Sequence, residues 1–239
     1  MATFVLVHGA AVGGWCWRWV APHLRAGGHV VVTPTMTGLG ERVHLASPSV
    51  DLNTHIEDLV NVLRYEDLTD VVLVGWSYGG MIVAGAADRA PERVGHIVYL
   101  DSDIPRDGDT SAPYSTHAFR QELADGHGDG WRVPPMSIGA DRVLLDGLDD
   151  ERRTWIADRW VPHLLVTWTQ PIRLTGAAAS IPTTYIRCTV DYDPTNEDTM
   201  RQDARIRSEP TWRYVEIAER HAAPFTAPEA VARVLLEVV

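Results

Sequence analysis

The amino-acid sequence predicts an α/β fold, with a mostly parallel sheet, helices on both faces and an inserted cap. Strand-length apolar runs alternate with helix-length amphipathic segments before residue 105 and again after residue 181. The strand runs are continuously apolar, which is typical of strands that are covered on both faces. The alternation stops in between, so we expect a core formed by residues 1–105 and 181–239 and a cap formed by residues 106–180.

The individual elements follow from apolar runs and from start and stop residues. The predicted strands are residues 3–7, 29–33, 71–74, 94–100, 183–189 and 212–217. The predicted helices are residues 15–26, a helix that ends near residue 65, and residues 80–87, 194–208 and 228–239. Ser49 or Asp51 can cap the second of these helices, and Pro228 fits the first turn of the last one.

The predicted cap is rich in Gly, Pro, Asp and Trp. Two helical pieces are expected within it, at about residues 148–160 and 163–175. Trp and Leu side chains at this density need apolar surface against which to bury. We therefore interpret residues 106–180 as a packed cap and not as a floppy loop.

The central motif is Gly75-Trp76-Ser77-Tyr78-Gly79, which has the pattern G-x-S-x-G. It lies between a predicted strand and a predicted helix, and this context indicates a nucleophile elbow, a strained turn that exposes a serine hydroxyl. Glycine is needed on either side because a Cβ would collide with the adjoining strand or helix. We predict that Ser77 is a catalytic nucleophile; the alternative is a glycine-rich turn with an incidental serine.

A serine nucleophile needs a base that takes its proton and an acid that orients the base. The chain has ten histidines, and His221 lies just after the last predicted strand, so we predict that it is the base. His8 ends the first strand, and we expect it to be a structural residue that is bonded to the backbone.

The acid is expected where a strand ends at the same edge of the sheet. Asp191 and Asp193 both follow the strand predicted at residues 183–189, and Asp101 and Asp103 follow the preceding strand. We predict Asp191, with Asp193 as the nearest alternative and the other pair as a further geometric option.

An oxyanion hole needs two backbone N–H groups close to the serine. We predict that Tyr78, the residue after the nucleophile, supplies one of them. Ala10 is predicted to supply the other, because the small residues of its loop allow the backbone to approach.

Composition and charge argue against several other functions. Lys and Arg number 21 and Asp and Glu number 32, which gives a net charge of −11, and no basic cluster favours nucleic acid or a membrane surface. Cys16 and Cys188 do not have the spacing of a zinc site or a disulfide framework. Without a dinucleotide fingerprint, P-loop or metal-ligand cluster, we expect no cofactor and no metal.

The ends of the chain and its apolar runs bear on location. The N-terminus lacks the features of a signal peptide, and no apolar run is long enough to cross a membrane, so we expect a cytoplasmic protein. The expected partner is a small-molecule apolar ester, and a homodimer is the assembly considered.

Three further motifs resemble a known family. Residues 4–10 read Phe-Val-Leu-Val-His-Gly-Ala, residues 14–17 read Gly-Trp-Cys-Trp, and residues 38–42 read Gly-Leu-Gly-Glu-Arg. With the elbow, they resemble the α/β-hydrolase superfamily, and in particular the bacterial esterase relatives of the plant methylesterase and hydroxynitrile lyase branch. The resemblance implies an α/β-hydrolase fold over nearly the whole chain. Cys188-Thr-Val-Asp191 is similar to the C-T-x-D segment that supplies the acid in the methylesterases, which favours Asp191.

Some positions depart from this family. The lyases of the branch carry a threonine after the first-strand histidine and a lysine after the catalytic histidine, where this chain has Gly9 and Ala222. Because the lysine stabilises the leaving cyanide, Ala222 counts against lyase activity. Many relatives carry a histidine where this chain has Trp76.

Together these features predict a serine hydrolase that cleaves a small apolar carboxylic ester through an acyl-enzyme. A lyase, lactonase or cyclase on the same scaffold is one alternative, and a non-catalytic ligand-binding protein is another. The side chains expected to line an apolar pocket under the cap, each of which could instead belong to the core, are Trp131, Met136, Trp155, Trp160 and Trp168.

Overall fold

The central feature of the computed structural model, which describes residues 1–111, 129–134, 145–190 and 197–239, is a six-stranded sheet with the order β2-β1-β3-β4-β7-β8. All neighbouring strands in it are parallel. The strands are β1 Thr3–Val7, β2 Val30–Val32, β3 Val71–Trp76, β4 Val94–Leu100, β7 Thr183–Cys188 and β8 Trp212–Ile217. The predicted α/β-hydrolase fold with a mostly parallel sheet is confirmed.

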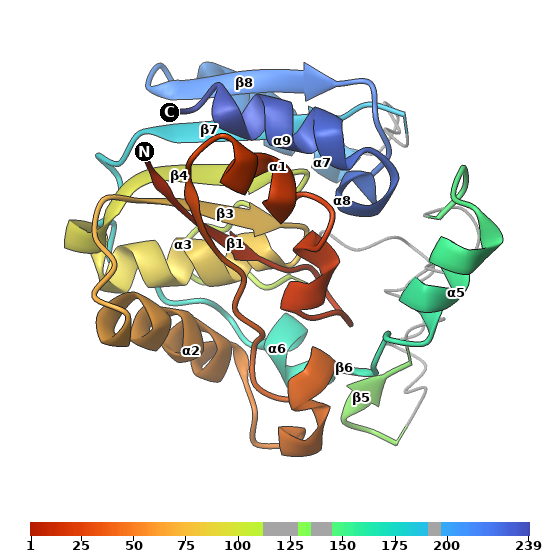
Figure 1. Cartoon of the computed structure of the whole chain (residues 1–239). Helices are drawn as coiled ribbons and strands as arrows, with labels where there is room; N and C mark the ends of the chain where they lie inside the picture. The colour runs from red at the N-terminus through yellow and green to blue at the C-terminus, as the bar shows by residue number, and fades with distance from the viewer. Residues whose placement is uncertain (112–128, 135–144, 191–196) are drawn as a thin grey trace.

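The strand order reverses direction at β1, whose neighbours in the sheet are β2 and β3. In such sheets ligands bind in the crevice outside the carboxyl ends of the strands, near the point of reversal. In Figure 1 the arrowheads of β3 and β8 point towards the same side of the molecule, and both chain termini lie on the opposite side. The loops that leave the arrowheads are therefore those that can build a site.

Helices cover both faces of the sheet and bury two separate apolar clusters. One face carries α2 Leu52–Tyr65, α3 Gly79–Arg89 and α7 Glu197–Ser208. The other carries α1 Ala21–Ala26, α8 Ala223–Thr226 and α9 Pro228–Leu236. The continuously apolar strands follow from this arrangement, because side chains on both sides of each strand are covered.

Local sequence explains where α2 begins. The Asp51 side chain accepts a hydrogen bond from the Thr54 main-chain N at 2.8 Å, and the Thr54 hydroxyl contacts the Asp51 main-chain N in return. This capping box satisfies main-chain donors of the first turn that have no partner inside the helix. The apolar residues of α2, which include Ile56, Leu59 and Leu63, are then buried against the sheet.

Two expected helices are wrong in their extent, and proline explains both differences. Residues 15–26 form a 3₁₀ turn, Gly14–Trp17, followed by the separate helix α1. Pro22 has no N–H to donate to a preceding turn, so it fits the beginning of a helix and not its middle. Within the expected helix at 163–175, α6 covers only Leu165–Thr169 and stops before Pro171.

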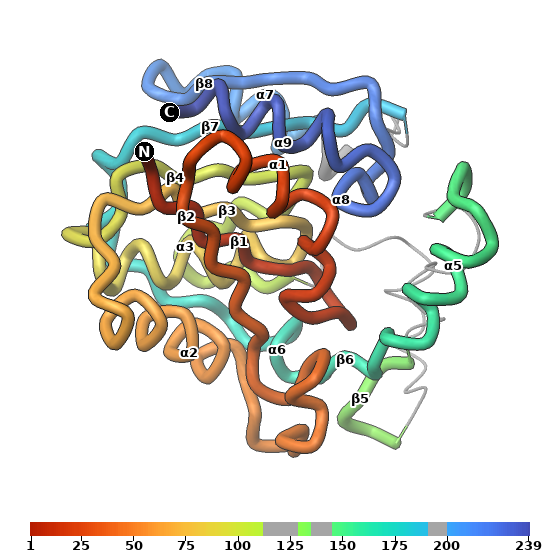
Figure 2. The backbone as a smooth tube through the Cα atoms, in the orientation of Figure 1, coloured from red at the N-terminus to blue at the C-terminus, as the bar shows by residue number. Residues whose placement is uncertain are grey.

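Among its described residues, the segment between β4 and β7 contains a small sheet as well as two helices. β6, His163–Leu164, pairs in antiparallel fashion with β5, Arg132–Val133, and α5 covers Asp150–Ala157. Figures 1 and 2 place α5, β5 and β6 beyond the carboxyl edge of the large sheet. In the part of the chain that the structure describes, no helix combines the length and apolarity needed to cross a membrane.

Candidate active site

The predicted nucleophile lies at a strained turn between β3 and α3. Ser77 has a φ of 55°, in the left-handed region that residues other than glycine rarely adopt. A Cβ on Gly79 would lie 2.8 Å from the His8 carbonyl oxygen, and one on Gly75 would lie 2.7 Å from the Gly79 carbonyl oxygen. The two glycines of G-x-S-x-G are thus required by backbone that passes close to them, and the strained turn is of the kind expected for a nucleophile elbow.

His221 follows β8 and contacts both a serine and a carboxylate. Its Nε2 lies 3.0 Å from the Ser77 hydroxyl oxygen, and its Nδ1 lies 2.7 Å from Oδ2 of Asp101. A carboxylate only accepts hydrogen bonds, so Nδ1 carries the proton of the neutral ring and Nε2 is left to accept from the serine. These three side chains therefore form a hydrogen-bonded chain of the kind that activates a serine.

Asp101 is held by two donors from the neighbouring strand β7. It follows β4 with a φ of 43°, and its Oδ1 accepts hydrogen bonds from Arg187 Nη1 at 2.9 Å and from the Cys188 main-chain N at 3.2 Å. Burial raises the pKa of Asp101, but the hydrogen bond and charge of His221 and the charge of Arg187 lower it below its ordinary value. The carboxyl is consequently ionised at neutral pH, as the partner of a histidine base must be.

The sequence prediction for the acid, Asp191, lies outside the described residues, as does its alternative Asp193. That prediction stays a prediction. The described carboxylate that faces His221 Nδ1 belongs to Asp101, which was one of the options after the preceding strand.

Asp103, the other option, has a different environment. Its Oδ2 accepts a hydrogen bond from the Ser111 hydroxyl at 2.5 Å, and its main-chain N donates to the Ser77 carbonyl oxygen at 3.2 Å. Burial raises the pKa of Asp103 to about 7, against the opposing effects of the Ser111 hydrogen bond and the charge of His221. A second titrating carboxyl therefore lies next to the elbow.

Arg187 is a residue of this site that the sequence reasoning missed. It lies within β7 and is 8% exposed, and its guanidinium joins Asp101 to Asp203 of α7. An arginine in an otherwise apolar strand is the signal that could have revealed it, because a buried cation requires carboxylate partners.

Trp76 is a second residue whose role the sequence did not explain. Its Nε1 donates a hydrogen bond to the main-chain oxygen of His221 at 2.8 Å, and its ring lies 5.8 Å from the imidazole. Trp76, which precedes Ser77, thus holds the backbone of His221, whose ring contacts Ser77.

The loop after β1 packs directly on the elbow. A Cβ on Gly9 would lie 3.2 Å from the Ser77 Cβ, which is closer than most Cβ contacts and shows that the loop lies directly against the elbow. The main-chain N–H groups of Ala10 and Tyr78 donate to no acceptor in the described part of the chain. Both of the predicted oxyanion donors therefore remain available to a ligand.

Two buried histidines fix the position of this loop. His8 Nδ1 donates to the Gly9 carbonyl oxygen at 2.8 Å, and its Nε2 accepts from the Met36 main-chain N at 3.1 Å, so the prediction of a structural residue is confirmed. His163 Nδ1 accepts from the Ala11 main-chain N at 3.0 Å. The latter contact ties the oxyanion loop to β6, in the segment that the sequence treats as a cap.

The predicted substrate-binding side chains have diverse environments. Trp168 is 3% exposed and stacks on His163 with ring centroids 4.1 Å apart, which makes it a core side chain. Trp155 packs edge-on against Trp15, with ring centroids 5.4 Å apart. Trp160 packs against the apolar cluster beneath α1, α8 and α9. The ring of Trp131 lies 4.5 Å from the Arg132 guanidinium. Met136 lies outside the described residues.

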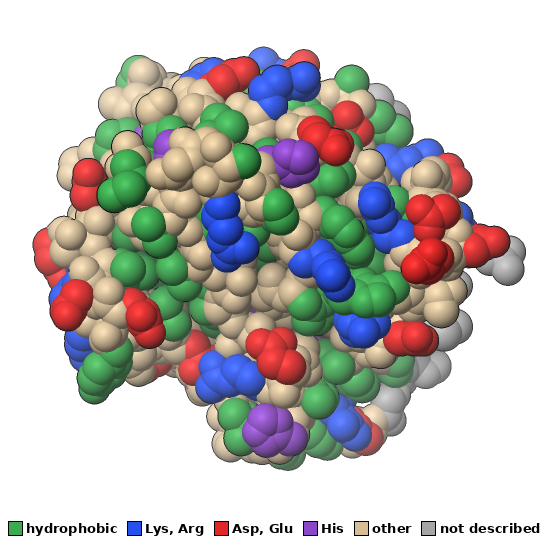
Figure 3. Space-filling view, viewed as in Figure 1, with side chains coloured by type: hydrophobic (Ala, Val, Ile, Leu, Met, Phe, Trp, Pro, Cys, Tyr) green, Lys and Arg blue, Asp and Glu red, His purple; other side chains and the backbone are tan. Residues whose placement is uncertain are grey.

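Over residues 1–111, 129–134, 145–190 and 197–239, no group of three or more His, Cys, Asp and Glu side chains is arranged to hold a metal ion. In Figure 3 acidic and basic side chains are interspersed over the visible face, without a large area of one sign.

Comparisons with known proteins agree with this geometry. Residues 4–234 match the model of the alpha/beta hydrolase family. A carbendazim hydrolyzing esterase from Nocardioides sp. is 35% identical over 241 residues, which cover 98% of each chain. A pheophorbidase from Raphanus sativus is 26% identical and covers 99% of this chain and 93% of its own.

A solved structure has the same fold. An extracellular alpha/beta-hydrolase from a Paenibacillus species, described as sharing homology with tobacco salicylic acid binding protein 2, has a TM-score of 0.81 at 22% identity, covering 99% of this chain and 98% of its own. The predicted resemblance to the methylesterase branch is confirmed, as is the prediction of an enzyme of the carboxylesterase type, because Arabidopsis thaliana methylesterases also match. The family match over residues 4–234, together with the full-length esterase relative, shows that this chain belongs to the alpha/beta hydrolase family.

Proposed function

We propose that this protein hydrolyses small apolar carboxylic esters through an acyl-enzyme on Ser77. The observation that carries the proposal is the hydrogen-bonded chain from Asp101 Oδ2 to His221 Nδ1, at 2.7 Å, and from His221 Nε2 to the Ser77 hydroxyl, at 3.0 Å. We assign Asp101 as the acid of the triad, in place of the Asp191 expected from the sequence.

In this mechanism the Ser77 oxygen attacks the ester carbonyl while His221 Nε2 takes the hydroxyl proton. The main-chain N–H groups of Ala10 and Tyr78 donate to the oxyanion that develops. His221 then gives its proton to the departing alcohol, and a water molecule, activated by the same nitrogen, releases the acid. Asp101 keeps Nδ1 protonated and offsets the charge of the imidazolium throughout.

We propose that the substrate is apolar and approaches from the side of the inserted segment. We propose that residues 106–180 act as a cap over the carboxyl edge, because α5, β5 and β6 lie there (Figure 1). Carbendazim is one substrate to test, because a full-length relative at 35% identity is named for its hydrolysis. Ala222 is 2% exposed and uncharged, so no cation follows the base to stabilise a cyanide leaving group.

The proposal is tested by the release of p-nitrophenol from short-chain p-nitrophenyl esters, followed from the first turnover. We expect a burst that is equal to the concentration of enzyme if deacylation is the slower step, and labelling of Ser77 by a fluorophosphonate. Ser77→Ala should abolish both. An intact wild-type protein that neither turns over nor labels would contradict the hydrolase and leave ligand binding without turnover as the function.

The identity of the acid is tested by Asp101→Asn and Asp191→Asn as a matched pair. We expect Asp101→Asn to lower kcat by about 10³-fold or more, since an amide at this position favours the wrong histidine tautomer. Asp191→Asn should leave most of the activity. If Asp191→Asn loses the activity and Asp101→Asn keeps it, and both variants unfold at the wild-type temperature, then Asp191 is the acid that orients His221.

A further inference from the structure

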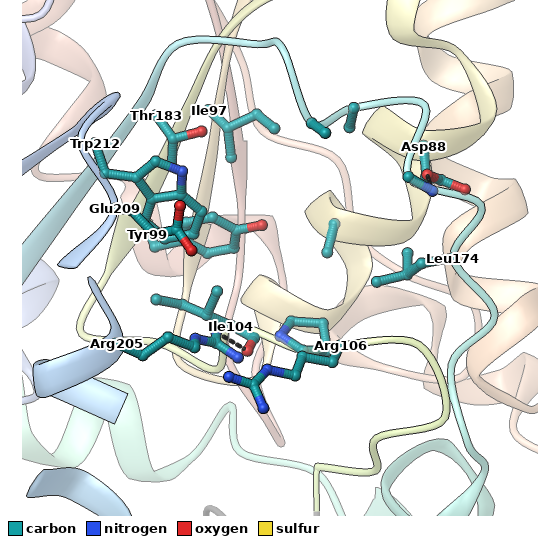
Figure 4. Close-up of a pocket in the computed structure, with 15 residues that line it drawn as sticks. Asp88, Ile97, Tyr99, Ile104, Arg106, Leu174, Thr183, Arg205, Glu209 and Trp212 are labelled. Carbon is teal, nitrogen blue, oxygen red and sulfur yellow. Dashed lines mark hydrogen bonds between the residues drawn. The ribbon is translucent and has the colours of Figure 1, made fainter. Parts of the chain in front are cut away.

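A cavity of about 270 Å³ lies away from the triad, between α3, α7 and the middle strands of the sheet (Figure 4). Neither Ser77, Asp101 nor His221 lines it. Its walls are largely apolar, with Ile104 and Leu174 on one side and the stacked rings of Tyr99 and Trp212, 5.8 Å apart, on the other. A cavity of this size is smaller than a typical drug-sized pocket and suits a small ligand.

The feature that distinguishes this cavity from a packing void is the hydroxyl of Tyr99. The side chain is 5% exposed, and its hydroxyl, which is not closed off from solvent, forms no hydrogen bond with the residues that the structure describes. In Figure 4 this hydroxyl points into the cavity. An unpaired hydroxyl that faces an open space is free to donate a hydrogen bond to a ligand.

The charged residues at the cavity differ in whether they are already paired. Arg205 donates to the Ile104 carbonyl oxygen at 2.6 Å, and Asp88 accepts from the main chain of Thr175, Gly176 and Ala177. The guanidinium of Arg106 has no partner in the described chain, and Figure 4 shows it at the same end as Arg205.

The ligand must satisfy donors at two places. At one end the Arg106 guanidinium offers a fork of N–H groups, which matches a carboxylate. Along the wall the Tyr99 hydroxyl can donate to an oxygen or nitrogen. Glu209, exposed beside Trp212, disfavours a second negative charge there, so the atom near Tyr99 should be uncharged.

We propose that this cavity is a second ligand site, separate from the triad, for a small apolar monocarboxylate. Its carboxylate pairs with Arg106, its apolar body packs on Ile104, Leu174 and the Tyr99 ring, and an uncharged polar group at its far end hydrogen-bonds to the Tyr99 hydroxyl. The site does not depend on the reaction proposed above.

Three probes separate the two contacts. The first, 4-hydroxyphenylacetate, carries both polar ends, while phenylacetate lacks the hydroxyl and 2-(4-hydroxyphenyl)ethanol lacks the charge. Binding is measured by calorimetry and by the change in Trp212 fluorescence, for which Trp212→Phe is the reference. We expect saturable binding of the first probe with a Kd of about 1 mM or tighter, and weaker binding of the other two.

Two substitutions should act on different probes. Arg106→Gln should weaken the two acids by roughly fivefold to tenfold and leave the alcohol unchanged, because it removes only the charge-assisted contact. Tyr99→Phe should weaken the two hydroxylated probes by about fivefold and leave phenylacetate unchanged. Arg64→Gln and Tyr65→Phe, adjacent exposed residues of α2 that do not line the cavity, are the matched controls.

The proposal is overturned if the first probe does not saturate, or if it binds equally well to both variants while these retain the wild-type unfolding temperature. Binding that is lost when Ser77 is labelled, and not when Arg106 is changed, would place the probe in the active site instead. Each of these outcomes leaves the proposed hydrolase activity unaffected, so failure of the second site and failure of the hydrolase can be distinguished.

Discussion

Trp76 links the nucleophile elbow to the base through one hydrogen bond. Its Nε1 donates to the main-chain oxygen of His221 at 2.8 Å. Trp76→Phe removes this donor, so the imidazole is less well oriented towards Ser77, and we expect kcat to fall about tenfold while KM changes little. The measurement is steady-state hydrolysis of a p-nitrophenyl ester across the pH range.

A matched control exists in the neighbouring Trp17. Its ring lies 6.3 Å from that of Trp76, it is fully buried, and its Nε1 has no hydrogen-bond partner among the described residues. Trp17→Phe therefore removes similar volume without removing a contact to the base, and it should lower stability but not kcat. If both variants lose kcat equally, the hydrogen bond is not what positions His221.

The residues of the proposed triad show what a sequence can and cannot predict. Ser77 and His221 were predictable, because G-x-S-x-G between a strand and a helix and a histidine after the last strand are both local patterns. The choice between Asp101 and Asp191 is not local. It depends on which strand end approaches His221 and on Arg187, which is 86 residues from Asp101 in sequence.

At the scale of elements, the close packing of α3 against the end of β4 makes one glycine of this helix essential. A Cβ on Gly80 would lie 2.0 Å from the Asp103 carbonyl oxygen, which belongs to the backbone of the loop that follows β4. We expect Gly80→Ala to lower the free energy of unfolding by more than about 3 kcal/mol.

Gly85 of the same helix provides the comparison. A Cβ there would meet Ile56 Cδ1 at 2.4 Å and Cγ1 at 2.8 Å, and these atoms belong to a side chain and not to the backbone. Because alanine also favours a helix more than glycine by about 1 kcal/mol, Gly85→Ala should cost less than Gly80→Ala. Urea unfolding of both variants tests the difference, and equal losses would show that the contact at Gly80 is relieved by movement.

Asp88 joins the end of α3 to the turn that precedes β7. Its carboxylate accepts from the Thr175 main chain at 2.7 Å and from the main-chain N atoms of Gly176 and Ala177, both at 2.9 Å. Burial raises the pKa of Asp88, but these hydrogen bonds lower it below its ordinary value. An asparagine at position 88 can accept hydrogen bonds only at its one carbonyl oxygen, whereas both carboxylate oxygens of Asp88 accept them.

We therefore expect Asp88→Asn to lower the free energy of unfolding by about 2 kcal/mol. Glu92→Gln is the control, because Glu92 is exposed and its ion pair with Arg93 spans 3.9 Å, so its loss should cost less than about 0.5 kcal/mol. Chemical unfolding at neutral pH measures both. A loss at Asp88 no larger than that at Glu92 would mean that the turn is held by other contacts.

Elements were predictable where their boundaries depend on neighbouring residues. The start of α2 follows from Asp51 and Thr54, which cap it. His163 and Leu164, expected in a helix, instead pair with Val133 and Arg132, which precede them by 30 and 32 residues. Such pairing reflects the burial of His163 beneath the oxyanion loop, and no local pattern encodes it.

For the whole molecule, three buried neutral histidines predict instability in acid. Burial lowers the pKa of His8 and of His55 to about 4 each, and that of His163 also lies well below its ordinary value. Between about pH 6.5 and pH 4 the unfolded chain binds these protons and the native chain does not, so stability falls as the pH falls.

The size of the change in the free energy of unfolding with pH follows from the number of protons that unfolding takes up. Each histidine contributes about 1.4 kcal/mol per pH unit in this range. Asp103, whose pKa is raised to about 7, has the opposite sign, because the native state holds its proton more tightly, and it offsets one histidine. A net change of two protons gives a slope of about 2.7 kcal/mol per pH unit.

Urea unfolding at pH 7, 6 and 5 measures this slope. His55→Gln removes one titrating ring and should reduce the slope by about 1.4 kcal/mol per pH unit, whereas His44→Gln, on the outside of the molecule, should not change it. A flat profile in the wild type would show that the buried histidines titrate normally.

Both thiols of the protein are buried in the cluster beneath α1 and α9, yet they belong to parts of the chain on either side of the segment inserted between β4 and β7. Burial raises the pKa of Cys16, so a thiol-specific reagent reacts with it only when the native structure opens. The alkylation rates of Cys16 and Cys188 in native buffer therefore report whether the two parts open together or separately. The two cysteines are thus natural probes of whether the native structure opens cooperatively. Because both react slowly, a cysteine introduced at the surface would be labelled first by a thiol-reactive dye.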